Sequence, residues 1–378
     1  MNQNLTSIPL LLSQRAAASG SQTILRIKDR GIWKAITWSE LDASVRAIGT
    51  ALLATDFGRG DVAAILSETR LEAVYADLAV LGAGAVSVAI DPDEEPDRVC
   101  HMLSSSGARL AFVENEEQLD KVLAVRDRCP ALAHIIVFDM KGLRDFTDTG
   151  CRSLANFTET TSATDWPAAL RAIEPDQPAV ILFPRNESTG RTLTHGDLVH
   201  MVSTARARLP LREGDNRLVV LRLSDITERV WGLYLALATG CIGNYPEGPD
   251  TIIENIQELQ PTVLGADAAV WLHLQALATA RTKSATSTQR AFYEWALRAG
   301  RAGGSVGRVA DLFVLQAIRR EFGLSKLRLA YVGGTPVAPA AVDWARSLGI
   351  TIQRVDEPVP GTDQVDERYR ALLQNAYA

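Results

Sequence analysis

Apolar residues follow two alternating patterns along this chain. Short β-branched runs predict strands, which we expect over residues 62–66, 85–90, 110–113 and 135–138. Longer segments with helical spacing separate the runs, as in the helix expected over residues 39–54, where Ser39 is a candidate N-cap and Leu41, Val45, Ile48 and Leu52 share a face. Strands alternating with helices are typical of α/β folds, in which helices cover both faces of mainly parallel sheets.

The same reading divides the chain into two α/β lobes and a tail. Residues 1–170 are expected to form the first lobe and a connector, because residues 141–177 show little periodicity. Residues 171–355 are expected to form the second lobe, with strands near 179–183, 218–223, 262–264 and 327–332. Residues 356–378 are expected to be a helical tail, whose apolar face contains Val365, Tyr369, Leu372 and Leu373.

Composition narrows the class of protein. With 378 residues, 47% of them hydrophobic and 22% charged, the chain has enough apolar surface for a large core. A net charge of −6 gives no global reason to expect a nucleic-acid partner. The longest apolar stretch, residues 73–90, is interrupted by Asp77 and by two glycines, so we expect buried core and no transmembrane segment. With dispersed cysteines and without a signal-peptide pattern, we expect reduced thiols and a cytoplasmic location.

Candidate chemistry is concentrated in the segment Ile181-Leu-Phe-Pro-Arg-Asn-Glu-Ser-Thr-Gly-Arg-Thr-Leu-Thr-His195. It resembles a shortened ATP-binding loop of the adenylate-forming (AMP-binding) acyl-CoA synthetases, specifically the long-chain fatty acyl-CoA ligase branch. Further strings support the resemblance in the family's order, from residue 8 to about residue 355. They include Trp33-Lys-Ala-Ile-Thr-Trp-Ser-Glu-Leu41, Glu228-Arg-Val-Trp-Gly-Leu-Tyr234 and Leu329-Ala-Tyr-Val-Gly-Gly-Thr-Pro336.

The resemblance implies a fold, an ancestral activity and a nucleotide site. The fold would be the N-terminal domain of these enzymes, ending before the small barrel and the C-terminal domain that carries a catalytic lysine. The activity would join a fatty acid to ATP, release pyrophosphate and transfer the acyl group to coenzyme A. Candidate nucleotide-site residues carried over by position are Ser188, Thr189, Gly190, Arg191, Thr194, Glu228, Gly333, Gly334, Thr335 and Pro336.

Several departures from the family pattern predict that this site is vestigial. No Pro-Lys-Gly triplet follows Gly190, and the planar guanidinium of Arg191 is not equivalent to the point charge of a lysine. Asp225 stands where relatives have a histidine, and it is also a candidate cap for a helix beginning near Thr227. Asp356 and Glu357 stand near the family's magnesium segment, but Pro358 follows them and the threonine is missing. We therefore expect no catalytic residue, no metal site and no cofactor.

Three functions remain open at this point. The first is a noncatalytic binding, regulatory or scaffolding subunit that assembles with itself, a complete acyl-CoA synthetase or another protein subunit. The second is a fatty acid–CoA ligase that uses ATP and Mg²⁺ and is active only with a partner chain. The third is a carrier that keeps the acyl pocket for a fatty acid or acyl-CoA.

A basic segment covers residues 276–308. Its cationic residues outnumber its single acid, Glu294, and are Arg281, Lys283, Arg290, Arg298, Arg301 and Arg308. Such a segment is either a contact for an anionic partner or membrane surface, or a solvated helix beside a mobile loop, which we place at residues 303–307. Phe292, Trp295 and Leu297 indicate that one side of the helix packs inward.

Overall fold

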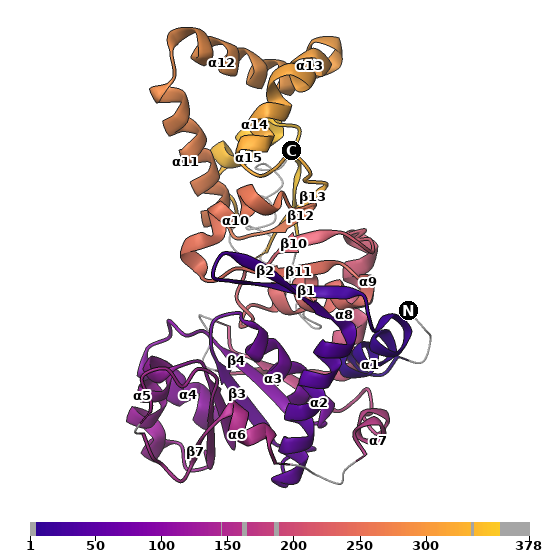
Figure 1. The fold of residues 1–378 in the computed structure, drawn as a ribbon, viewed down its shortest axis with the longest axis vertical. Helices are drawn as coiled ribbons and strands as arrows, with labels where there is room; N and C mark the ends of the chain where they lie inside the picture. Colours follow the sequence, from indigo (N-terminus) through magenta and orange to yellow (C-terminus); the bar gives the residue numbers. More distant parts are fainter. Residues whose placement is uncertain (1–4, 145, 161–164, 185–188, 334–335, 356–378) are drawn as a thin grey trace. The chain divides into compact units, whose positions relative to one another are not determined.

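The computed structural model describes residues 5–144, 146–160, 165–184, 189–333 and 336–355. The chain forms two compact units, shown in Figure 1. The first unit contains residues 1–27, 32–210 and 222–240, and the second contains residues 28–31, 211–221 and 241–378. The boundary expected between residues 170 and 171 lies inside the first unit, because β8 (Pro178–Leu182) pairs with β4 (Val86–Ile90). The C-terminal tail lies outside the described residues.

The first unit is built on one sheet of order β7-β6-β5-β3-β4-β8-β9. Its remaining strands are β3 (Val62–Leu66), β5 (Leu110–Val113), β6 (His134–Val137), β7 (Cys151–Ser153) and β9 (Arg191–Thr194). Neighbouring strands are parallel except β8 and β9, which are antiparallel. Every residue of β3 is buried, as expected for a central strand with both faces covered.

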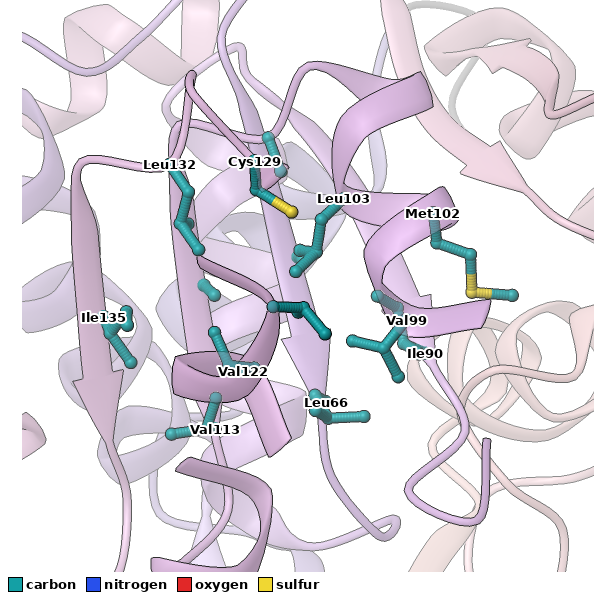
Figure 2. Packing of buried hydrophobic residues seen from close by; sticks show 14 of the residues in the cluster. Leu66, Ile90, Val99, Met102, Leu103, Val113, Val122, Cys129, Leu132 and Ile135 are labelled. Atoms are coloured by element: carbon teal, nitrogen blue, oxygen red, sulfur yellow. The ribbon is translucent and has the colours of Figure 1, made fainter. Parts of the chain in front are cut away.

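Helices cover the two faces of this sheet. On one face, side chains of α4 (Pro96–Ser106) and α5 (Glu116–Val125) pack against alternate residues of β3 and its neighbours. Figure 2 shows this layer, with Val99, Met102 and Leu103 of α4 above Leu66. On the other face, α3 (Leu71–Gly82) packs on β3 and β4, and α2 (Trp38–Ala54) packs on α3.

Further helices complete the first unit. They are α1 (Ile8–Ser19), α6 (Leu154–Thr158), α7 (Trp166–Arg171), α8 (His195–Arg208), the π-helical η2 (Thr227–Tyr234), α9 (Leu235–Thr239) and the short η1 (Arg126–Arg128). A Cβ atom at Gly49 or Gly82 would lie 2.2 or 2.5 Å from the ring of Trp166. The two glycines therefore make room for the indole that anchors α7.

The second unit is built on strands in the order β14-β13-β12-β10-β11. These strands are β10 (Asn216–Leu218), β11 (Ile242–Tyr245), β12 (Val263–Gly265), β13 (Leu329–Val332) and β14 (Ile352–Arg354). Most residues of β1 (Thr23–Asp29) and all of β2 (Ile32–Thr37) belong to the first unit. The pairs from β14 to β11 are parallel. Its helical segments are η3 (Pro249–Thr251), α10 (Ile252–Leu259), α11 (Ala268–Ser284), α12 (Ser287–Ala302), α13 (Gly304–Ala310), η4 (Asp311–Leu315), α14 (Gln316–Glu321) and α15 (Pro339–Ser347).

The α/β class with mainly parallel sheets is confirmed, and four local predictions need correction. Thr37, not Ser39, caps α2, because its hydroxyl and Glu40 form a capping box. The strand expected over residues 218–223 ends at Leu218. Residues 141–177 include three short elements, β7, α6 and α7. The loop expected over residues 303–307 is mostly helical, because Gly303 ends α12 with a φ of +66° and α13 begins at the next residue.

Within the residues that the structure describes, no helix is both long enough and apolar enough to cross a membrane.

Candidate functional site

The loop-like segment joins β8 and β9 in the first unit. The strands pair with Leu182 opposite Arg191, so residues 183–190 form the connection. Ser188 lies outside the described residues, whereas Thr189 and Gly190 are exposed and Arg191 is half-buried in β9. The start of the connection is held by α4, because Arg98 donates a 3.0 Å hydrogen bond to the carbonyl of Pro184.

Gly190 is explained by packing within the hairpin. A Cβ atom at this position would lie 2.6 Å from Cγ2 of Ile181 and 3.0 Å from Cζ of Phe183. Phe183 itself makes an edge-to-face ring contact with His101 of α4, at 6.3 Å between centroids. The close approach permitted by this glycine is therefore used by side chains of the protein.

Thr194 begins α8. Its side chain accepts a 3.1 Å hydrogen bond from the N–H of Asp197, and the Asp197 carboxylate accepts bonds from the N–H and hydroxyl of Thr194. This capping box satisfies backbone donors at the helix start. Thr194 is thus engaged in local structure.

His195 is the first residue of α8 and is fully buried. Neither ring nitrogen has a hydrogen-bond partner among the described residues. Burial lowers the pKa of His195 to about 4, because the charged imidazolium is disfavoured away from water. The side chain is therefore neutral at pH 7 and packs as part of the core.

Glu228 and Arg229 lie in η2 and are fully buried. Arg229 donates to Oδ1 of Asp77 at 2.6 Å and to Oγ of Ser87 at 2.8 Å. The hydroxyls of Ser87 and Tyr234 also donate to Asp77, each at 2.6 Å. Burial, followed by the adjacent Asp77 charge, holds the pKa of Tyr234 well above its ordinary value.

This buried network was missed by sequence reasoning. In the sequence, Asp77 stands out only as an interruption of an apolar stretch, and Arg229 only as part of a string shared with the family. A lone acid inside a helix that is otherwise buried is itself a signal, because buried charges are paired. The partner could not be named, since it lies 152 positions along the chain.

A second charged cluster lies where β3 and β4 end. Arg222 pairs with three carboxylates that follow these strands, Glu68 at 3.1 Å, Asp93 at 2.7 Å and Asp91. Burial makes the largest contribution to the raised pKa of Glu68, and the positive charge of Arg222 lowers this pKa in part. Open α/β sheets commonly bind ligands beyond the carboxyl ends of their strands. Here that edge carries more carboxylates than the cluster's single guanidinium can neutralise.

Asp225 serves the start of η2. Its Oδ1 accepts a 2.7 Å hydrogen bond from the N–H of Thr227, which confirms the alternative reading of Asp225 as a cap. Gly333 and Pro336 follow β13 in the second unit, where Gly333 is buried and Pro336 is half-buried. Gly334, Thr335, Asp356 and Glu357 lie outside the described residues.

The described members of the predicted site differ in their accessibility. Among the described members of the predicted site in the first unit, Thr194 caps a helix, Glu228 is buried, and Thr189, Gly190 and Arg191 remain accessible in whole or in part. No group of three or more His, Cys, Asp and Glu side chains in the described part of the chain is placed to hold a metal ion.

Comparison with known proteins places the chain in a family. The model of the AMP-binding enzymes matches residues 12–356. The chain is 25% identical over 342 residues to the long-chain-fatty-acid–CoA ligase FadD15 of Mycobacterium bovis, covering 85% of this chain and 55% of the ligase. It is 21% identical to the ligase ACSBG2 of Xenopus laevis, covering 92% and 50%. The chain thus spans about half the length of these relatives.

Solved structures agree in fold. The N-terminal domain of FACL13 from Mycobacterium tuberculosis superposes with a TM-score of 0.68 at 17% identity, covering 93% of this chain and 76% of that domain. The adenylation domain of a carboxylate reductase from Mycobacterium chelonae gives a TM-score of 0.73 at 17% identity, covering 95% and 58%. The fold is that of the N-terminal domain of adenylate-forming enzymes, and the chain belongs to the family of AMP-binding enzymes.

Proposed function

We propose that this chain is an acyl-CoA synthetase-like protein that does not form acyl adenylates and acts as a noncatalytic binding, regulatory or scaffolding subunit. One observation carries the proposal. Strand β9 begins at Arg191, directly after Gly190, and Arg191 pairs with Leu182 of β8. The hairpin therefore closes at the point where the resemblance calls for the Pro-Lys-Gly triplet.

Arg191 is a poor substitute for the missing lysine. Its backbone is fixed in a strand, and its side chain is half-buried. A lysine in a flexible loop places a compact charge on a phosphate, whereas a guanidinium that starts from a paired strand has a different origin and shape. Adenylyl transfer depends on positioned charge, so this change removes the main electrostatic support for the reaction.

Two further features support the same proposal. Glu228 is fully buried, so in this conformation it does not reach a nucleotide. The cluster of Glu68, Asp91, Asp93 and Arg222 gives the carboxyl edge of β3 and β4 an excess of negative charge, which disfavours a phosphate there.

The test is ATP–pyrophosphate exchange by the purified chain with saturated fatty acids of medium and long chain length. A full-length long-chain-fatty-acid–CoA ligase serves as the positive control. We expect no exchange that depends on the fatty acid. Robust exchange that is lost in Arg191→Ala and retained in the matched surface variant Arg206→Ala would overturn the proposal.

A ligase that works with a partner chain is the competing function, because the matched relatives are named as ligases and the match covers only 55% and 50% of their length. The same assay distinguishes it when the separately produced C-terminal domain of a full-length relative is added. Exchange, or acyl-CoA formation, that appears only in the mixture would favour this second function. Inactivity of the mixture agrees with the noncatalytic proposal.

A further inference from the structure

The second unit carries a group of large apolar side chains that are exposed to solvent. We call them, together with the helices that carry them, the α12–η4 surface. α12 packs against both α13 and η4, and Figure 1 shows α12 and α13 side by side. The exposed apolar residues of this surface are Phe292, Trp295, Val306, Val309, Leu312 and Phe313. The expectation that Phe292 and Trp295 pack inward is therefore wrong.

The apolar residues follow the periodicity of a helix face. Val306, Val309 and Phe313 recur at intervals of three and four residues, while Gly307 and Ala310 are buried against the protein. The exposed fraction is 67% for Leu312 and 73% for Phe313. Phe292 and Trp295 add an edge-to-face pair on α12, with ring centroids 6.5 Å apart. Exposed apolar side chains that gather on helices packed against one another are typical of an interaction site.

The segment that carries this surface is basic. Residues 287–315, which form the helices of this surface, contain four basic residues and two acidic ones, Glu294 and Asp311, which gives a charge of +2 in a chain whose net charge is −6. Arg290, Arg298, Arg301 and Arg308 are all exposed. The surface therefore combines apolar side chains with positive charge that is opposite in sign to that of the whole protein.

A surface pocket of about 550 Å³ opens within this segment. Gly303 and Gly304 line it at the turn between α12 and α13, and Arg308, Leu312 and Gln316 line it from the following helices. Arg308 contributes an exposed guanidinium, and Leu312 belongs both to the pocket and to the apolar patch. Asp311 and Arg319 also line the pocket and form an ion pair at 2.6 Å. Arg308 thus adds a cation next to an apolar side chain, which suits an anionic group attached to a hydrocarbon chain.

We propose that the α12–η4 surface docks on an anionic lipid bilayer. The apolar side chains enter the boundary between headgroups and acyl chains, and the arginines bind lipid phosphates. One lipid phosphate occupies the pocket beside Arg308. Helices with Trp, Phe and Leu together with Lys and Arg bind membrane interfaces in this way, by apolar burial and by attraction to anionic lipids. This inference goes beyond the proposed function and does not depend on the fate of the nucleotide site.

Charge complementarity favours a lipid surface over a second copy of the chain. A symmetric dimer through this surface would bring the same arginines from both copies together, and like charges across an interface are unfavourable. An anionic bilayer presents the opposite charge and an apolar interior at once.

The experiment measures binding of the full chain to vesicles by flotation. Vesicles of phosphatidylcholine alone are compared with vesicles that also contain phosphatidylglycerol, at low and at high salt. We expect binding that requires the anionic lipid and weakens with salt. Equal binding to both vesicles, or none to the anionic ones, would contradict the proposal.

Two sets of variants locate the contact. Leu312→Asn with Phe313→Asn is expected to weaken vesicle binding at least about tenfold, because the apolar burial is lost. Arg298→Gln, Arg301→Gln and Arg308→Gln are each expected to weaken it about fivefold. The matched controls, Ile32→Asn and Arg206→Gln, change exposed residues elsewhere and should leave binding unchanged.

Two outcomes of this series would overturn the assignment. One is that the surface variants and the controls bind vesicles equally well. The other is that the Leu312 and Phe313 changes abolish self-association in analytical ultracentrifugation while vesicle binding stays the same, which would assign the surface to a protein contact. Circular dichroism and thermal unfolding of each variant show whether it is folded, and these exposed positions are expected to leave the midpoint unchanged.

Discussion

The guanidinium of Arg229 lies 2.6 Å from the carboxylate of Asp77, and the side chains are 1% and 0% exposed. The pair joins η2 to α3 inside the first unit, and Ser87 and Tyr234 supply two further hydrogen bonds to the same carboxylate. Since an unpaired buried charge is strongly unfavourable, this network ties η2 to α3 and β4.

Removing one partner of this pair should destabilise the protein far more than removing a surface charge. Arg229→Met leaves the Asp77 carboxylate buried without its cation, and we expect the free energy of unfolding to fall by about 3–5 kcal/mol. Arg206→Met, which removes an exposed arginine, should change it by less than about 0.5 kcal/mol. Urea unfolding of both variants measures the difference, and similar midpoints would contradict the role assigned to the pair.

Burial of His195 should make the fold sensitive to acid. Its folded pKa of about 4 lies below the ordinary value of 6.5, so the unfolded chain binds a proton in this range and the folded chain does not. The stabilisation is complete above pH 6.5 and is lost as pH falls toward 4, by about 3 kcal/mol in all. Substituting this side chain should make the free energy of unfolding depend less on pH between pH 6.5 and pH 4.

His195→Gln is the test and His200→Gln is its control, because His200 lies on the same helix and is exposed. We would measure the free energy of unfolding from pH 7 to pH 4 for both. The slope should decrease for His195→Gln and stay at the wild-type value for His200→Gln. Identical slopes in all three proteins would show that His195 does not titrate as inferred.

Gly190 should matter for stability even when no nucleotide is present. An added Cβ would lie 2.6 Å from Ile181, so we expect Gly190→Ala to lower the free energy of unfolding by about 1–3 kcal/mol. Ile181→Ala in the same chain should relieve part of that loss, which a double-mutant cycle measures. Gly58→Ala is the matched control, since its nearest neighbour would lie at 3.6 Å.

An unaltered midpoint for Gly190→Ala would argue against the packing role. If that variant instead lost a measurable affinity for ATP, the glycine would serve close approach of a phosphate, and the noncatalytic proposal would be weakened.

Arg222 should stabilise the fold only while its carboxylates are ionised. Arg222→Met leaves Glu68, Asp91 and Asp93 facing one another, and we expect a loss of about 2 kcal/mol at pH 7. The pKa of Glu68 is raised, chiefly by burial, so this carboxyl takes up a proton early as the pH falls. The difference in the free energy of unfolding between wild type and variant should therefore become smaller as the pH falls. A difference that grows would contradict the stabilising role assigned to Arg222.

Much of the fold was predictable from local patterns. The strands at residues 62–66 and 110–113 were predicted with their observed bounds, because continuous apolar runs of that length are typical of buried parallel strands. The elements missed between residues 141 and 177 are short, with three residues in β7 and five in α6. Periodicity has little meaning over such lengths. The glycines at 303 and 304 predict a loop, but their two successive positive φ angles make a sharp turn with only Gly303 between α12 and α13.

The candidate site was predictable only in part. The helix start near Thr227 follows from the type of residue at Asp225, and the capping bond is present. The reason for Gly190 depends on its place opposite Ile181 and Phe183, which the hairpin creates. The networks of Asp77 with Arg229 and of Arg222 with Asp91 join residues more than a hundred positions apart, and no local pattern specifies such pairs.

The most direct test of the central claim is calorimetric titration of the purified chain with ATP and Mg²⁺, followed by a stable acyl-adenylate analogue. The account predicts no saturable heat from either ligand, because the hairpin closes at Arg191 without the lysine-bearing loop. Micromolar binding of the analogue that is lost in Arg191→Ala and kept in Arg206→Ala would contradict it and would restore the ligase function.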